Sequence, residues 1–223
     1  GSEGFEIFAE SPIRIQSSIS STTQDSMAKY YSPNAISHQD MSASFKDYGE
    51  TISDGLGITN HNPLGLNIQL QSYSWNYSYA DAFVILNYSF KNSSLDTIRN
   101  IYAGIWTDAS VANFNYTDYY TPGGGFTWYD NLNGFDESLD ESGFNRSIGY
   151  QYDTDGDDGW AESYIGISVL GGSIPMRNLS TYYSQWVWTN SNNSDYPAYS
   201  MPLNDNERYV KMSTSVPKGT GPE

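Results

Sequence analysis

The chain of 223 residues contains no cysteine and little positive charge. Without cysteine it has no disulfide bond, no thiolate nucleophile and no cysteine-ligated zinc. Its 10 Lys and Arg residues stand against 26 Asp and Glu residues, which gives a formal net charge of −16. Such a charge repels nucleic acid and anionic membrane surfaces, so neither is expected as a partner. No apolar run approaches the roughly 18 residues of a spanning helix, and membrane insertion is not expected.

Sequence signatures of catalysis are also missing. The chain has no HExxH metalloprotease motif, no GxSxG nucleophile elbow and no glycine-rich phosphate loop. Its two histidines, His38 and His61, stand in polar segments, which is a weak basis for a catalytic triad. A glycosidase-type pair of carboxylates stays open as an alternative, with Glu162 and Glu207 as the residues to test. The main expectation is a protein without enzymatic activity.

Aromatic residues are abundant by contrast. The chain has 20 Tyr, 6 Trp and 9 Phe, which together make 16% of its residues. Charged residues also reach only 16%, so the polar surface must consist mostly of Ser, Thr, Asn and Gly. This composition suits strands and turns, and it disfavours both helices and disorder. We therefore expect a secreted or cell-surface β protein.

Hydrophobic patterning predicts the secondary structure. Strands are expected at residues 66–71, 82–91, 101–106 and 164–170, where apolar residues alternate with polar ones or run continuously. Residues 40–57 hold turn residues and few apolar ones, so this segment is expected to be irregular. A short helix is expected within residues 204–213, because an asparagine cap precedes a glutamate by three residues. The predicted class is all-β: an antiparallel β-sandwich or jelly roll with long loops and at most one or two short helices.

The expected domain organisation is simple. Residues 1–60 form an extended, loop-rich lead, with short edge strands at 6–10 and 13–15. Residues 61–215 form the β-sandwich domain, and residues 216–223 a flexible tail. The first four residues look partly like the remnant of a tag, so the chain is expected to be a mature segment.

An acidic loop between residues 152 and 162 is the sharpest local motif. Asp153, Asp155 and Asp157 alternate with small residues, so a tight turn can gather several of the oxygen ligands that Ca²⁺ prefers. These carboxylates repel one another, and a bound cation relieves that repulsion. The loop resembles the start of an EF-hand loop but departs from it at its glycines and at its twelfth position. The candidate further ligands are Asp158, Glu162 and Asp108. A structural Ca²⁺ is predicted, with a solvated acidic turn as the alternative.

Some aromatic residues are candidates for stacking against sugar rings. Flat rings beside Asn and Asp side chains are a common way to hold carbohydrate on a β-sandwich. The candidates are Trp128, Tyr129, Trp186 and Trp188, and also Trp75, Tyr77 and Tyr79. The alternative for the same rings is a place in the core, since the chain has few aliphatic residues to fill one.

Six short stretches within residues 63–213 form a further pattern. They are Pro63–Leu66, Ser72–Trp75, Asp81–Tyr88, Ile101–Asp108, Gly149–Gly156 and Tyr164–Gly166. Together they resemble an uncharacterised extracellular β-sandwich domain of large secreted or surface proteins from Bacteroidota-like bacteria. The resemblance implies a non-enzymatic extracellular module, with metal associated at Asp108 and at the Asp153–Asp157 loop.

These observations predict a calcium-stabilised structural or adhesive module of a secreted or cell-surface protein. A carbohydrate-binding module that uses exposed Trp and Tyr rings is one alternative. A self-assembling extracellular filament subunit is another, whose mark would be an N-terminal strand within residues 5–16 donated to a neighbour. The expected partners are polysaccharides, other surface proteins or further copies of the chain.

Overall fold

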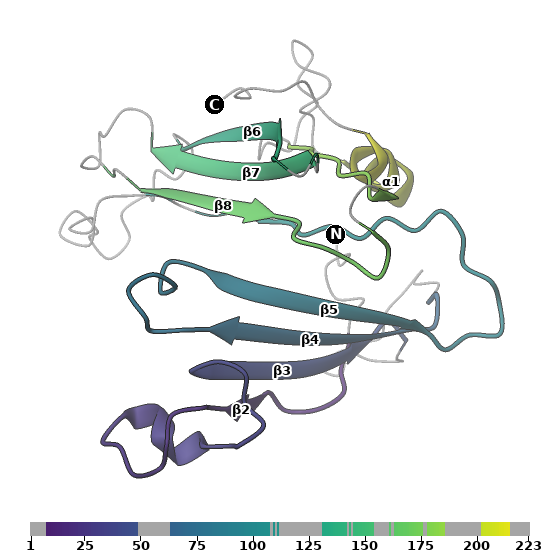
Figure 1. Ribbon diagram of the computed structural model, residues 1–223. Helices are drawn as coiled ribbons and strands as arrows, with labels where there is room; N and C mark the ends of the chain where they lie inside the picture. Colours follow the sequence, from purple (N-terminus) through teal and green to yellow (C-terminus); the bar gives the residue numbers. More distant parts are fainter. Residues whose placement is uncertain are drawn as a thin grey trace, which may run out of the picture. The chain divides into compact units, whose positions relative to one another are not determined.

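The structure is a computed structural model in which two compact units, Gly1–Asn100 and Ile101–Glu223, can be distinguished. It describes residues 8–48, 63–107, 109, 111, 131–141, 143, 145–153, 161, 163–175, 178–185 and 202–214. Each unit contains an antiparallel sheet (Figure 1). These two antiparallel sheets confirm the predicted all-β class. The expected boundary near residue 60 lies outside the described residues.

The first unit has a five-stranded sheet among its described residues. Its strands are β1 (Phe8–Ala9), β2 (Arg14–Gln16), β3 (Gln39–Lys46), β4 (Leu66–Ser74) and β5 (Val84–Asn92). The order is β1-β3-β4-β5, and β2 also pairs with β3. A 3₁₀ helix, Ser26–Tyr30, stands between β2 and β3. The predicted strands at the N-terminus, β4 and β5 are confirmed. Strands β1 and β2, which lie in the segment named for the filament alternative, pair with β3 of the same chain.

The first sheet separates apolar from polar side chains by its register. Phe45 pairs with Ile68, which pairs with Phe90, and all three share one face because side chains alternate along a strand. Ser44, Gln69 and Ser89 form the corresponding row on the opposite face. We call the first side the apolar face; on β3, β4 and β5 it carries Met41, Ala43, Phe45, Leu66, Ile68, Leu70, Val84, Leu86, Tyr88 and Phe90.

Strand β3 corrects the prediction that residues 40–57 are irregular. The segment Gln39–Lys46 pairs along its whole length with β4. Met41, Ala43 and Phe45 do alternate with polar residues, but serine and alanine dilute the signal. Strand β3 forms because it pairs with β4, whose apolar and polar residues alternate strongly, although the sequence of β3 alone predicts a strand only weakly.

The second unit has a three-stranded sheet among its described residues, in the order β6-β7-β8. Its strands are β6 (Asn131–Leu139), β7 (Asn145–Asp153) and β8 (Tyr164–Ser168). In the turn between β6 and β7, the Gly143 N–H donates to the Asp140 carbonyl at 2.9 Å, and Gly143 has a φ of +76°. Glycine takes this left-handed conformation without the steric cost of a Cβ. The prediction of β8 is confirmed.

Two expectations for this unit are wrong. The segment Ile101–Trp106 was predicted as a strand, but it forms none. Instead its Tyr102 ring makes edge contacts with Tyr182 at 5.7 Å and Tyr209 at 5.3 Å between centroids. Tyr102 therefore packs from an irregular segment, whereas Ile101, Ile105 and Trp106 are each more than half exposed. The set of predicted strands also lacks β6, because its many polar residues conceal it.

The core of the second unit lies on the β6–β7 face that carries Phe135. Phe135 is 8% exposed and stacks on Tyr183, with ring centroids 4.8 Å apart and planes 9° apart. Gly149 is the register partner of Phe135, and a Cβ there would approach the Tyr183 ring at 3.1 Å. The Tyr183 hydroxyl donates to the buried Gln185 side chain at 2.6 Å. Segment 181–185 therefore closes this face of the sheet.

The predicted C-terminal helix is confirmed as α1 (Asp205–Ser213). The Glu207 N–H donates to the Asn204 side chain at 3.0 Å, and the Glu207 carboxylate accepts from the Leu203 N–H at 2.7 Å. This reciprocal arrangement satisfies donors at the helix start. On the last turn, Lys211 donates to the Gln185 carbonyl at 3.4 Å, and burial lowers the pKa of its ammonium group. No helix in the described part of the chain is long and apolar enough to cross a membrane.

Candidate functional site

Most of the predicted calcium loop lies outside the described residues. This applies to Asp155, Asp157, Asp158, Glu162 and Asp108. Asp153 is described as the last residue of β7, and its Oδ2 accepts a hydrogen bond from the Ala161 N–H at 2.8 Å. That bond joins the two positions that flank residues 154–160. Within the described ranges, no group of three or more His, Asp or Glu side chains could hold a metal ion.

The predicted aromatic candidates divide in the same way. Trp128, Tyr129, Trp186 and Trp188 lie outside the described residues. Trp75, Tyr77 and Tyr79 are described, and they occupy the connection between β4 and β5. Trp75 is half-buried and contacts Phe83, with ring centroids 6.0 Å apart. Tyr77 and Tyr79 instead come together at the surface.

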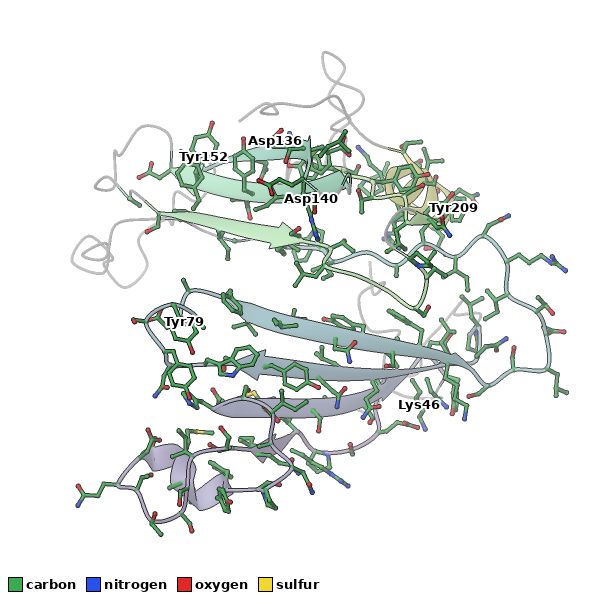
Figure 2. The ribbon with its side chains drawn as sticks, in the orientation of Figure 1. Lys46, Tyr79, Asp136, Asp140, Tyr152 and Tyr209 are labelled. Carbon is green, nitrogen blue, oxygen red and sulfur yellow. The ribbon has the colours of Figure 1, made fainter. Side chains whose placement is uncertain are left out.

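We call the surface cluster of His38, Tyr77 and Tyr79 the tyrosine ledge. The Tyr77 and Tyr79 rings are stacked, with centroids 5.3 Å apart and planes 9° apart. The His38 ring meets Tyr77 edge-on at 4.5 Å. Tyr79 is 82% exposed, and Figure 2 shows it at the end of the sheet where β4 leads into β5. The outermost ring thus offers its surface to solvent and is supported from behind.

The pairing of β3 with β4 brings His38 to the ledge. Gln39, the first residue of β3, pairs with Ser74, the last residue of β4, so the residues just beyond them are neighbours. The Asn76 N–H donates to His38 Nδ1 at 2.9 Å, which places the proton of the neutral ring on Nε2. The fully buried Ser17 donates its hydroxyl to the His38 carbonyl at 2.6 Å. These bonds fix His38 beneath Tyr77.

A tight turn fixes the two tyrosines. The Ala80 N–H donates to the Tyr77 carbonyl at 2.7 Å, which closes a turn over residues 77–80. Ala80 is buried, so the turn is anchored to the unit while its tyrosines remain outside. The exposed Asn76 and Asp81 stand just before and just after this turn. A surface built in this way is ordered before any ligand arrives, which reduces the entropy lost on binding.

The ledge has the chemistry to bind a sugar ring. The axial C–H groups of a pyranose form an apolar patch, and the electron-rich face of an aromatic ring is its complement. Asn76 and Asp81 can exchange hydrogen bonds with the surrounding hydroxyls. Stacked tyrosines in a core would be buried, whereas Tyr79 keeps most of its surface in water. The ledge is therefore the candidate functional site of the first unit.

Sequence reasoning missed a second, partly exposed cluster, which we call the tyrosine face. It consists of Tyr150 and Tyr152 on β7 and Tyr164 on β8. Tyr152 is paired with Tyr164, and their rings stack with centroids 5.2 Å apart and planes 18° apart. Tyr150 lies 5.9 Å from Tyr152 and 6.1 Å from Tyr164. The spacing of two between Tyr150 and Tyr152 was a usable signal, because it places both on one face of a strand.

The surroundings of the tyrosine face also shift the pKa of Tyr152. Desolvation raises the pKa of the Tyr152 phenol above its ordinary value of 10.0, and the neighbouring Tyr150 and Tyr164 raise it further. The neutral phenol is therefore favoured in the folded protein. Any stability gained in this way is present below pH 10 and is lost as the pH rises through the folded-state pKa.

The alternative of a glycosidase-type carboxylate pair gains no geometric support. Glu207 is engaged in the capping box of α1, where its two carboxylate oxygens accept from the Leu203 N–H and the Asn204 amide, both at 2.7 Å. Glu162 lies outside the described residues. No family model, curated protein or solved structure matches this chain.

Proposed function

We propose that the chain is a non-enzymatic adhesive module of a secreted or cell-surface protein, and that it binds carbohydrate through the tyrosine ledge. The observation that carries this proposal is the position of Tyr79. Its ring is 82% exposed, yet it is stacked on Tyr77 and held by a closed turn. An ordered aromatic surface left in water is typical of a binding site rather than of a core. The net charge of −16 favours neutral over acidic glycans.

Removal of the outer ring tests this function. In affinity electrophoresis through gels that contain xylan, mannan or mixed-linkage β-glucan, we expect at least one polymer to retard the wild-type protein. The variant Tyr79→Ala should lose about tenfold in affinity for that polymer, as expected for one aromatic contact. Tyr79→Phe should keep most of the binding, because it keeps the ring.

A matched control separates the ledge from general surface effects. Tyr31 is an exposed tyrosine outside both tyrosine clusters, so Tyr31→Ala should leave retardation unchanged. Circular dichroism and thermal unfolding should show that every variant is folded. Equal retardation of Tyr79→Ala and wild type by every polymer would show that the ledge is not the binding surface.

We further propose that the apolar face of the first sheet is covered by a second layer, as in a β-sandwich. Four residues of the apolar face on β5, namely Val84, Leu86, Tyr88 and Phe90, are between 38% and 59% exposed. An antiparallel sheet with one apolar face is stable when another layer covers that face. The alternation along β3, β4 and β5 supports the sandwich in the same way.

A pair of neighbouring substitutions tests the sandwich. Leu86→Ser removes an apolar side chain from the apolar face and should lower the free energy of unfolding by about 1.5 kcal/mol or more. Asn87→Ser changes the next residue, on the polar face, and should cost about 0.5 kcal/mol or less. Urea denaturation measures both. Sedimentation equilibrium is the second readout: a wild-type dimer that Leu86→Ser converts to a monomer would mean that a second copy, not a sandwich layer, covers the face.

We also propose that Ca²⁺ stabilises the module at the acidic loop that follows β7. The supporting contact is the hydrogen bond from the Ala161 N–H to Asp153 Oδ2, at 2.8 Å. It brings together the ends of a segment whose sequence concentrates carboxylates. Millimolar Ca²⁺ outside the cell is sufficient to fill even a weak site of this kind.

A further inference from the structure

The three rings of the tyrosine face lie on one side of the second sheet. Tyr150 stands in register between Gly134 on β6 and Gly166 on β8. A Cβ at Gly134 would overlap the Tyr150 ring, so the ring must lie over the bare backbone of β6. The glycine therefore leaves room for the Tyr150 ring to extend across β6.

The adjoining row extends this surface. Tyr152 and Tyr164 are cross-strand partners with nearly parallel rings, and Tyr164 is 66% exposed. The two rows are successive positions on the same face of β7. The Tyr150 ring lies 5.9 Å from Tyr152 and 6.1 Å from Tyr164 between centroids, and its plane is tilted from theirs by 37° and 54°. Three aromatic rings are thus close together on one face of the sheet.

Polar groups continue the same face beyond the rings. Asp136 on β6 pairs with Ile148, two residues before Tyr150, so its carboxylate lies on the tyrosine side of the sheet (Figure 2). Asp136 is exposed, and its Oδ1 accepts from the Glu137 N–H at 2.8 Å. A hydrogen-bonded carboxylate of this kind accepts hydrogen bonds from ligand hydroxyls. At the end of the face, Arg146 forms an ion pair with Asp140 at 2.8 Å.

We infer that the tyrosine face is a second carbohydrate-binding surface, which takes several consecutive residues of a linear, neutral glycan. The exposed surface of Tyr164 can meet the apolar C–H face of one sugar, the neighbouring tyrosines extend the aromatic surface to the next sugars, and Asp136 meets hydroxyl groups at the side. An acidic glycan is disfavoured by Asp136 and by the net charge of the chain. The tyrosine face lies in the second unit and shares no residue with the tyrosine ledge, so the two proposals can be tested independently.

The experiment uses the full chain with the ledge removed. In the Tyr79→Ala background, isothermal titration calorimetry is carried out with cellohexaose, xylohexaose, mannohexaose and laminarihexaose. We expect at least one hexasaccharide to bind, and the corresponding disaccharide to bind about tenfold more weakly, because it covers fewer rings. Adding Tyr164→Ala should weaken hexasaccharide binding about tenfold, whereas adding Tyr31→Ala should not change it.

A glycine variant tests the geometry without removing a ring. Gly134→Ala should lift the Tyr150 ring from the sheet and weaken hexasaccharide binding, while circular dichroism stays that of the parent. If Tyr164→Ala disturbs folding, Tyr164→Leu together with Gly134→Ala gives the same comparison. Absence of binding by all four hexasaccharides, or binding unchanged by Tyr164→Ala and Gly134→Ala, would overturn the inference. If Tyr164→Ala weakens hexasaccharide binding in calorimetry while Tyr79→Ala leaves retardation in the gels unchanged, the inference about the tyrosine face is upheld and the proposal for the tyrosine ledge is refuted.

Discussion

Replacement of Phe135 by Ala is expected to lower the free energy of unfolding of the second unit by about 3–5 kcal/mol. Phe135 is 8% exposed and stacks on Tyr183 at 4.8 Å, so its removal leaves a cavity between β6 and segment 181–185. Gly149, the residue opposite Phe135, has no side chain to fill that cavity. Urea denaturation, monitored through the NMR signals of residues in β6–β8, measures this change in the free energy of unfolding.

A control from the same strand isolates the contribution of burial. Leu139 lies four residues after Phe135 on the same face of β6, but it is 74% exposed. Leu139→Ala should therefore cost about 0.5 kcal/mol or less. Equal losses in the two variants would mean that Phe135 is not the centre of this core.

Chelation of calcium is expected to lower the melting temperature of the protein clearly, and addition of Ca²⁺ to restore it. The acidic loop adds mutual repulsion to a chain whose net charge is already −16. A cation that binds only the folded state stabilises it by about 2.7 kcal/mol at a hundredfold excess over its dissociation constant. Differential scanning calorimetry with and without chelator measures the shift.

Two further measurements test whether the effect is specific to Ca²⁺ and to the acidic loop. Mg²⁺ should restore stability poorly, because it gives up its water ligands reluctantly. Asp155→Ala should lose most of the response to Ca²⁺, whereas Asp96→Ala, an exposed aspartate in the first unit, should keep it. A wild-type melting temperature that neither chelator nor Ca²⁺ changes would leave the loop as a solvated acidic turn.

The sequence predicted the strands and the helix whose signal is local. Alternation at Leu66, Ile68 and Leu70 gave β4, and the Asn204–Glu207 capping box gave α1. Strand β6 was missed because Asn, Asp, Glu and Gly dominate it, and such residues read as a loop. The burial of its Phe135 becomes visible only through the long-range contact with Tyr183.

The candidate sites, too, could be predicted only where the signal is local in the sequence. Tyr77 and Tyr79 could be proposed from sequence because they lie two residues apart after a predicted strand. His38 could not, because only the register of β3 with β4 brings it beside Asn76 and Tyr77. The tyrosine face depends on the cross-strand pair of Tyr152 with Tyr164, and the position of the Tyr150 ring depends on Gly134, which lies on a strand that was not predicted. Contacts of this kind depend on pairing, which local patterns do not specify.

The division of the chain at Asn100 places the two proposed glycan-binding surfaces in different units. If both surfaces bind as proposed, a single chain would be bivalent toward a repetitive glycan. After one surface dissociates, the other keeps it at a high effective concentration near the next site, so rebinding outpaces escape. Two weak contacts can then exceed either affinity by roughly 10²–10⁴ when linker and spacing permit both to engage. Retention would thus be governed by valency, and single-site variants would shorten residence time far more than they change the first encounter.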